Sequence, residues 1–213
     1  GDWSSDVCSS DLEDRDVPGA NQTENRCIIS ENPQRNFLLL TSPNFAILQC
    51  MQNKPFIDLV RQRTSCRSYV PQPVSREHLE LMLEAARLAP SVCNKQPWRF
   101  VVIQDEALRK KILIEEAFLA GIPMKWAVNA GAIIALGMEK SAITHRIAPK
   151  ISGVEYPLLD LGIAGEHLVL QAEELGLGTC WIGWIKPKKV REIVGWPRSI
   201  EPVSLITVGW PST

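Results

Sequence analysis

Residues 160–184 read DLGIAGEHLVLQAEELGLGTCWIGW, and this stretch does most to decide the fold. Apolar side chains occupy nearly every side of the helix expected between residues 157 and 175. A helix that is apolar all round is buried all round, within a core or against a second subunit. Gly176 is placed to cap that helix. The following residues, TCWIGWI (179–185), have the branched and aromatic composition of a buried strand.

The flanking segments add further helices and strands. Ser75 is a good N-cap, and the helix that it begins must end by Ala89, because Pro90 excludes helical geometry from the residue before it. Other helices are expected at 55–62, 105–118 and from Pro187 to before Gly195, and other strands at 98–104, 129–138 and 201–210. These elements show no strict β–α–β rhythm and no G-x-G-x-x-G fingerprint. The pattern favours a layered α+β domain.

Composition limits the possible partners. The chain has 213 residues, 45% hydrophobic and 22% charged, with a formal net charge of −1. A net charge so close to zero favours neither nucleic acid nor an anionic membrane as a binding partner. No apolar run approaches the roughly 18 residues that are needed to cross a bilayer. The six cysteines show no CxxC pair and no zinc-ligand spacing, so we expect no metal site and a reduced, cytoplasmic setting. The alternative is a reactive thiol at Cys93 or Cys180.

The first fifty residues lack the patterning of the rest. Residues 1–12, GDWSSDVCSSDL, resemble a widely used sequencing adapter translated in frame, so we expect an assembly artefact there. Residues 13–50 show scattered polar residues without a sustained period, and the alternative reading is a genuine disordered tail. We therefore expect a non-native or disordered leader at 1–50, a native start at Met51, and one domain at 51–213.

Three separated stretches have the chemistry of a binding site. Arg63, Thr64, Ser65 and Arg67 place two guanidinium groups and two hydroxyls within five residues, which suits a phosphate. The alternative for this stretch is a solvated basic loop.

The second stretch, PSVCNKQPW (90–98), joins a helix to a strand and carries amides between two prolines. Its Asn94 side chain can donate to and accept from the edge of a heterocycle, although the polar groups can equally cap the helix end. The third stretch, GLGTCWIGW (176–184), places a glycine beside two tryptophans. That pattern indicates close backbone approach by something flat, or else a bulge in a packed strand.

Together these stretches resemble the FMN-dependent nitroreductase family, in the short form found in anaerobic bacteria. The matching signatures are RTSCRSY (63–69), ARLAPSVCNKQPWRFVV (86–102) and DLGIAGEHLVLQAEELGLGTCWIGW (160–184). They occur in the family's order and spacing, and the likeness covers residues 51–213. The resemblance implies a homodimeric α+β protein of three layers, with a central mixed sheet flanked by helices and FMN bound at the dimer interface.

The resemblance also assigns roles to residues. Arg63, Thr64, Ser65 and Arg67 would hold the phosphate and ribityl chain of FMN. The other contacts with FMN would come from two subunits. Trp181, Ile182 and Gly183 would line the isoalloxazine ring. Pro90, Ser91 and Asn94 would reach the flavin from the partner subunit. Lys125 is a further candidate, near the N1–C2 carbonyl. The helix at 157–175 would form the core of the dimer. The family usually continues past the last strand into a tail that wraps the partner, so we expect the C-terminal tail to be truncated at Thr213.

The implied reaction is ping-pong transfer of a hydride from NADH or NADPH through flavin N5 to a nitroaromatic, a quinone or a similar small acceptor. No side chain is expected to act as a catalytic nucleophile, and the three histidines are expected to pack or to lie exposed. Two alternatives stay open. One is a non-catalytic flavin-binding or flavin-storing protein. The other is a dehalogenase-like or flavin-fragmenting relative on the same fold.

Overall fold

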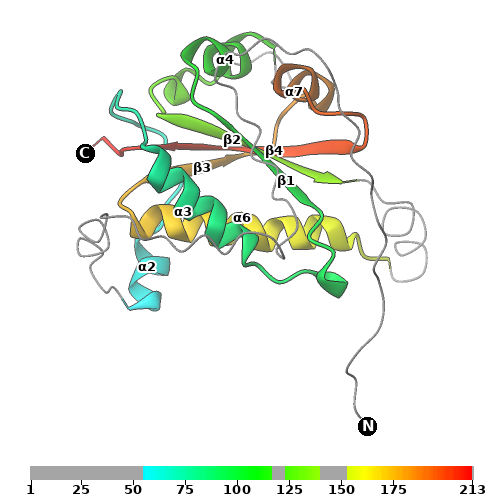
Figure 1. Cartoon of the computed structure of the whole chain (residues 1–213). Coiled ribbons are helices and arrows are strands. Elements are labelled where there is room, and N and C mark those ends of the chain that lie inside the picture. Colours follow the sequence, from blue (N-terminus) through cyan, green and yellow to red (C-terminus); the bar gives the residue numbers. More distant parts are fainter. Residues whose placement is uncertain (1–54, 117–122, 140–152, 213) are drawn as a thin grey trace.

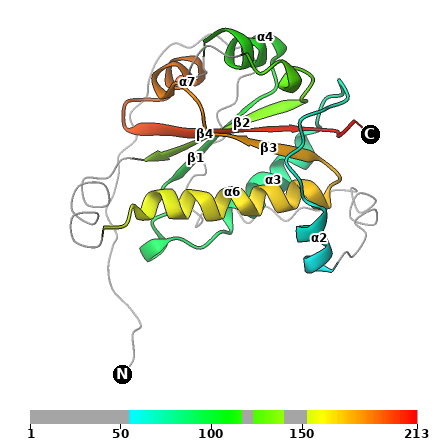
Figure 2. The same ribbon diagram turned by 180° about the vertical axis from the view of Figure 1, so that it is seen from behind.

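The computed structural model describes residues 55–116, 123–139 and 153–212. In these ranges four strands form an antiparallel sheet with the order β1-β2-β4-β3. The strands are β1 (Trp98–Ile103), β2 (Ala132–Glu139), β3 (Gly178–Ile182) and β4 (Ile200–Gly209). Helices cover both faces of this sheet (Figures 1 and 2). The expected leader at 1–50 lies outside the described residues.

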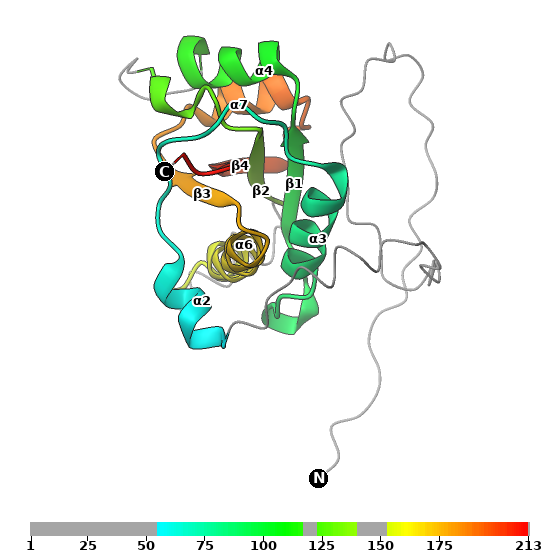
Figure 3. The ribbon, with the colours of Figure 1, turned by 90° about the vertical axis from the view of Figure 1, so that its left-hand side faces the viewer.

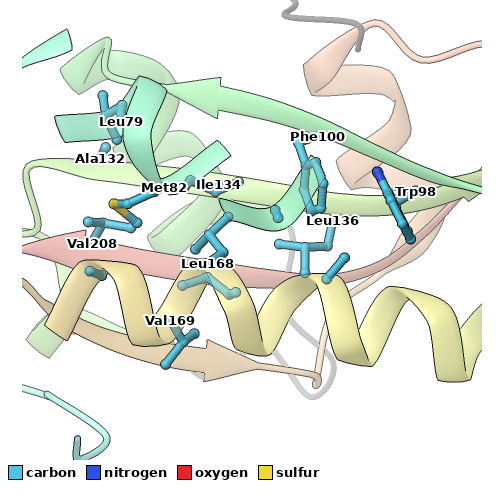
Figure 4. Packing of buried hydrophobic residues seen from close by; sticks show 14 of the residues in the cluster. Leu79, Met82, Trp98, Phe100, Ala132, Ile134, Leu136, Leu168, Val169 and Val208 are labelled. Atoms are coloured by element: carbon cyan, nitrogen blue, oxygen red, sulfur yellow. The ribbon is translucent and has the colours of Figure 1, made fainter. Parts of the chain in front are cut away.

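The first helical layer consists of α3 (Arg76–Arg87) and α6 (Tyr156–Glu174), which pack on one face of the sheet. Leu79 and Met82 of α3 meet Leu168 of α6 and the inward side chains of β2, including Ile134 and Leu136 (Figure 4). Each fully buried side chain of this size contributes about 1.5–3 kcal/mol to folding. The short helix α2 (Phe56–Gln62) lies beside α6 and has no buried residue.

The second helical layer covers the opposite face of the sheet. It contains α4 (Glu106–Lys110), which continues as the π-helical segment η2 (Lys111–Glu116), and α7 (Pro187–Val194). Successive side chains of a strand point to opposite faces, so Ile133 and Ala135 of β2 pack here while their neighbours pack on α6. Two short 3-10 turns complete the described elements, η1 (Val92–Asn94) and η4 (Lys125–Ala127).

The expected α+β fold in three layers is confirmed, and the end view of the molecule shows the sheet between its two helical layers (Figure 3). The expectation of a mixed sheet needs a correction for the described residues. Their four strands pair only antiparallel, and the parallel component is the isolated bridge between Ser65 and Thr179. That bridge adds a short parallel contact to the outer edge of β3 without forming a fifth strand.

The predicted helix ends are close to the observed ones. The Ser75 hydroxyl accepts a hydrogen bond from the backbone N–H of His78, as an N-cap should, and Gly195 ends α7 with a φ of 72°. The strand expected at 179–185 is shorter than predicted, because β3 ends at Ile182. Beyond it the backbone N–H of Ile185 bonds to the Gly183 carbonyl at 2.9 Å, and this tight turn leads into α7. Gly183 therefore lies just after the strand and not within it.

Helix α6 is not buried on every side in the single chain. Its inner side, including Leu161, Ala164 and Leu168, is buried against the sheet. On its outer side Leu158 and Leu159 are exposed. The expectation of burial on every side is therefore not met within one chain. Among the helices that the structure describes, none has both the length and the apolar character needed to span a membrane.

Candidate functional site

The segment 63–70 runs from the end of α2 along the outer edge of β3 (Figure 3). The backbone N–H of Cys66 donates to the Thr179 carbonyl at 2.8 Å, next to the bridge between Ser65 and Thr179. Further along, Val70 N–H donates to the Trp210 carbonyl at 2.9 Å. Two of the three predicted stretches, 63–67 and 176–184, are therefore brought side by side within one chain.

Gly178 is required for this close approach. A Cβ atom at that position would lie 2.7 Å from both Cβ and Sγ of Cys66, which is closer than real side chains pack. The absence of a side chain lets the basic segment lie directly against the first residue of β3.

The two predicted phosphate-binding arginines have no carboxylate partner among the described residues. Arg61, Arg76, Arg87, Arg99 and Arg191 each form an ion pair with an acidic side chain. In the same described ranges neither Arg63 nor Arg67 does, and the Thr64 and Ser65 side chains between them are exposed. The segment therefore offers, within five residues, two guanidinium groups without a carboxylate partner and two exposed hydroxyls, which is a donor set for an anion.

Strand β3 offers backbone hydrogen-bonding groups beside this cationic segment. Because the Thr179 carbonyl points outward to Cys66, the N–H and carbonyl of Trp181 point to the same outer edge. Among the described residues no further strand covers that edge. A Cβ built on Gly183 meets nothing within 4 Å, so the surface after the strand is open.

The side chains of Trp181 and Ile182 lie on opposite faces of β3. The Trp181 ring packs over Gly165 of α6 and remains 38% exposed. Ile182 is 4% exposed and packs in the core beneath α7. Any contribution of Ile182 to a surface site is therefore made by its backbone, whereas Trp181 can offer both its ring and its backbone.

The second predicted stretch, residues 90–98, forms a loop with a strained backbone and internal hydrogen bonds. Cys93, Asn94 and Gln96 have φ values of 52°, 51° and 47°, in the left-handed region that costs most residues about 1–2 kcal/mol each. The Ser91 hydroxyl accepts from the Gln96 N–H at 2.9 Å, and the Asn94 side chain accepts from the Gln96 amide at 3.1 Å. Strain of this kind persists where the surroundings enforce it and is common at binding sites.

This loop lies far from the other two stretches in the same chain. Its Val92 N–H donates to the buried Asp160 carboxylate, in the second turn of α6, at 3.1 Å. Gly178, which contacts Cys66, follows the opposite end of α6 (Figures 1 and 2). The helix has 19 residues, which corresponds to about 28 Å. Pro90, Ser91 and Asn94 therefore do not meet Arg63, Arg67 or Trp181 within one chain.

Lys125, the further candidate, lies on the α4 and α7 side of the sheet. It is exposed and opens the η4 turn, and the next residue, Trp126, stacks on Tyr69 with ring centroids 6.5 Å apart. Since Tyr69 belongs to the segment that follows the arginines, Lys125 lies at the same end of the sheet as they do. Among the described residues, no hydrogen bond or ion pair of its side chain fixes a role for it.

Of the two thiols named as possible reactive groups, Cys93 is exposed and Cys180 is buried. Burial raises the pKa of the Cys180 thiol, and the nearby Arg67 guanidinium opposes that rise. A buried thiol with a raised pKa is a poor nucleophile, which argues against the reactive-thiol alternative at Cys180. His167 contacts the Ala85 carbonyl at 3.2 Å and packs between α3 and α6, as expected. His145 lies outside the described residues.

Two buried residues next to this surface were not predicted from the sequence. The Tyr69 hydroxyl contacts the Cys66 carbonyl and the Thr207 hydroxyl, each at 2.8 Å. Tyr69 ends the signature RTSCRSY, but a tyrosine there is equally typical of an ordinary core position. Thr207 lies in an apolar strand, and nothing in its local sequence distinguishes it.

The sequence is similar to one protein family and to individual known proteins. The model of the nitroreductase family matches residues 60–210. A protein of Archaeoglobus fulgidus, provisionally named as an NADH dehydrogenase or NAD(P)H nitroreductase, is 34% identical over 161 residues, which cover 73% of this chain and 84% of the relative. A Bacillus subtilis protein named as an FMN reductase that uses NAD(P)H is 32% identical over 160 residues, which cover 70% of this chain and 62% of that protein.

Solved structures show the same likeness. The crystal structure of a nitroreductase family protein from Clostridium novyi NT superposes with a TM-score of 0.66 at 27% identity and covers 75% of this chain and 86% of that one. A nitroreductase family protein from Clostridium difficile 630 gives a TM-score of 0.63 at 31% identity, with the same coverage of both chains.

Proposed function

Because this chain belongs to the nitroreductase family, we propose that it catalyses the reduction of nitroaromatics, quinones and similar small acceptors by NADH or NADPH. It is an FMN-dependent oxidoreductase. The observation that carries the proposal is the cationic surface at 63–67, which lies against the open edge of β3. Bound FMN supplies the hydride chemistry at N5 in a ping-pong cycle, and the protein supplies binding, orientation and electrostatics.

The described donor set fits FMN. Its phosphate group is a dianion, and Arg63 and Arg67 have no carboxylate partner among the described residues. Thr64 and Ser65 add hydroxyl donors for the phosphate or the ribityl chain. A charge-assisted hydrogen bond to such a group is worth roughly 1.5–3 kcal/mol. We assign the phosphate to this segment.

The flavin ring system is assigned to the end of β3. The backbone of Trp181 presents an N–H and a carbonyl to the unpaired edge, where the polar rim of a flat heterocycle can pair with them. Gly183 leaves the adjoining surface free of a side chain. The exposed Trp181 and Trp184 rings then act as apolar walls that exclude water from the bound ring.

A second copy of the chain would complete the site. Pro90, Ser91 and Asn94 lie at the far end of α6, so they can reach a flavin held at 63–67 only if it belongs to another subunit. The exposed apolar residues of α2 and α6 favour such an association, since exposed apolar surface is common at interfaces. They are Phe56, Ile57, Val60, Leu158 and Leu159. We propose a homodimer with FMN at its interface.

The cytoplasm is the compartment that we propose. Cys66, Cys93 and Cys180 are all unpaired thiols in the described part of the chain. Unpaired thiols are typical of the reducing cytoplasm.

Absorption spectroscopy of the purified protein tests the proposed function. The protein should carry the yellow colour of FMN, bleach when NADH or NADPH is added under anaerobic conditions, and regain its colour when a nitroaromatic or a quinone follows. Colour that NAD(P)H does not bleach would contradict catalysis and indicate flavin storage instead. If NAD(P)H bleaches the flavin but neither a nitroaromatic nor a quinone restores its colour, the protein is an oxidoreductase that acts on another class of substrate. A dehalogenase-like relative would behave in this way.

A further inference from the structure

Tyr69 connects the cationic segment to the centre of the sheet. Its side chain is 4% exposed, and its hydroxyl lies 2.8 Å from the Cys66 carbonyl and 2.8 Å from the Thr207 hydroxyl. Thr207 belongs to β4 and is fully buried. Hydrogen bonds of the Tyr69 phenol therefore link Thr207 in β4 to the peptide that precedes Arg67.

The direction of each hydrogen bond follows from the chemistry of the groups. A carbonyl only accepts, so the single hydroxyl hydrogen of Tyr69 is donated to the Cys66 carbonyl. The Thr207 hydroxyl must then donate to the Tyr69 oxygen, or to the Cys180 carbonyl at 3.4 Å, which is the longer contact. Burial raises the pKa of the Tyr69 phenol far above its ordinary value, so the phenol stays protonated and remains a donor.

These bonds fix both polar groups of one residue. The Cys66 N–H is held by the Thr179 carbonyl at 2.8 Å, and its carbonyl is held by Tyr69. Because peptide units are planar, fixing both groups sets the orientation of the peptides on either side of Cys66. Those peptides determine the direction in which the Ser65 and Arg67 side chains leave the backbone.

We propose that Tyr69 and Thr207 are positioning residues that preorganise the segment 63–67 for the phosphate group of FMN. This inference rests on the proposed function, since it requires Arg67 to hold that phosphate. Neither residue touches the cofactor. Their role is to hold the Cys66 peptide so that the arginine and the neighbouring hydroxyl face the anion before it arrives, which lowers the ordering entropy that binding must overcome.

The test compares FMN with riboflavin, which shares the ring and the ribityl chain but lacks the phosphate. The affinity of the flavin-free full-length protein for each ligand is measured by fluorescence quenching, for the wild type, Tyr69→Phe, Thr207→Val and Thr207→Ser. Tyr69→Phe should reduce the FMN-to-riboflavin affinity ratio about tenfold, which equals about 1.4 kcal/mol. Thr207→Val should reduce it about threefold, while Thr207→Ser, which retains a hydroxyl, should keep the wild-type ratio.

The outcomes separate the alternatives. An equal loss of affinity for both flavins in Tyr69→Phe would overturn the inference in favour of a purely structural role, and wild-type affinity for both flavins in a folded Tyr69→Phe protein would overturn it outright. If Tyr69→Phe does not fold, Thr207→Val decides by the same ratio. A wild-type protein that binds riboflavin as tightly as FMN would instead refute the assignment of the phosphate to the arginines, which belongs to the proposed function.

Discussion

At the residue scale, Arg63 and Arg67 lack, among the described residues, the carboxylate partners that five other arginines have, and they differ from Arg198, which also lacks one, by lying within one five-residue segment. Exposed ion pairs, such as Arg76 with Glu80 on α3, contribute little to stability. An exposed cation without such a partner is fully available to an anionic ligand. The two arginines of the cationic segment are therefore explained better by binding than by folding.

Arg67→Ala is expected to weaken FMN binding by roughly 1.5–3 kcal/mol, because the phosphate dianion loses a charge-assisted hydrogen bond. Isothermal titration calorimetry at fixed ionic strength measures the change. Arg76→Ala is the matched control, because it removes an exposed arginine from the surface of α3. FMN affinity that is unchanged in Arg67→Ala would remove this residue from the site.

The buried phenol of Tyr69 makes stability depend on alkaline pH. Its ordinary pKa is 10.0, and burial raises the folded-state value. Above about pH 10 the unfolded chain has lost this proton while the folded chain retains it, so the free energy of unfolding falls by up to about 1.4 kcal/mol per pH unit. Burial also raises the pKa of Cys180 above its ordinary value, so this thiol contributes a fall of the same sign at lower pH.

Urea unfolding at a series of pH values measures this dependence. In Tyr69→Phe, the decrease in the free energy of unfolding that begins near pH 10 should be absent. The same slope in the wild type and the variant would show that the phenol is not held protonated by the fold.

The individual site residues were predictable to different degrees. Arg63, Ser65 and Arg67 stand out in the sequence because two guanidinium groups and a hydroxyl so close together have few structural uses. Tyr69 and Thr207 do not stand out, since their hydroxyls become significant only when segments 138 positions apart meet. Ile182 fits the pattern of the site, but the alternation of a strand sends its side chain into the core.

At the element scale, the contact between α6 and β3 holds the proposed flavin-binding edge in place. The Trp181 ring lies over Gly165, where an added Cβ would be 2.3 Å from Cη2 of the ring. A glycine in mid-helix is normally unfavourable by about 1 kcal/mol relative to alanine. Here it allows the strand and its tryptophan to approach the helix closely.

Gly165→Ala is therefore expected to destabilise the fold by about 1–3 kcal/mol through overpacking and to displace Trp181. The urea midpoint and the tryptophan fluorescence maximum report these two effects. Gly162→Ala is the matched control on the same helix. A Cβ at Gly162 meets nothing within 4 Å, so this change should be neutral or stabilising. Equal stability of the two variants would contradict the packing described for Trp181.

The elements themselves were largely predictable from local patterns. Helix α3 follows from its cap and its apolar stripe, and α7 follows from Pro187 and Gly195. The end of β3 was placed too late, because Trp184 and Ile185 continue the apolar pattern beyond Gly183. The pairing of the strands and the bridge at Ser65 depend on distant segments, so no local pattern specifies them.

At the scale of the whole molecule, the distance along α6 separates the two halves of the proposed site, and the first turn of the same helix exposes Leu158 and Leu159. Leu159 is 53% exposed, and Phe56 of the adjacent α2 is 68% exposed. In a dimer formed through this surface, each flavin would contact the 63–67 segment of one subunit and the 90–94 loop of the other.

Leu159→Glu is expected to convert the protein to a monomer and to abolish tight flavin binding, since a charge cannot be buried in the interface without a partner. Sedimentation velocity and the flavin content after gel filtration measure both effects. Ile114→Glu provides the control, because it places the same charge on an exposed apolar position of η2, across the sheet from α6. A dimeric, yellow Leu159→Glu protein would place the interface elsewhere.

Subunit complementation is the most direct measurement of whether one flavin is shared by two chains. One variant carries Arg63→Ala and Arg67→Ala, the other carries Ser91→Ala and Asn94→Ala, and each alone should lose FMN. After unfolding and refolding together, mixed dimers combine one intact and one doubly defective site, so FMN binding should return to about one quarter of the wild-type sites. If the mixture binds no more FMN than the separate variants, both halves of the site belong to the same chain and the shared-site account is wrong.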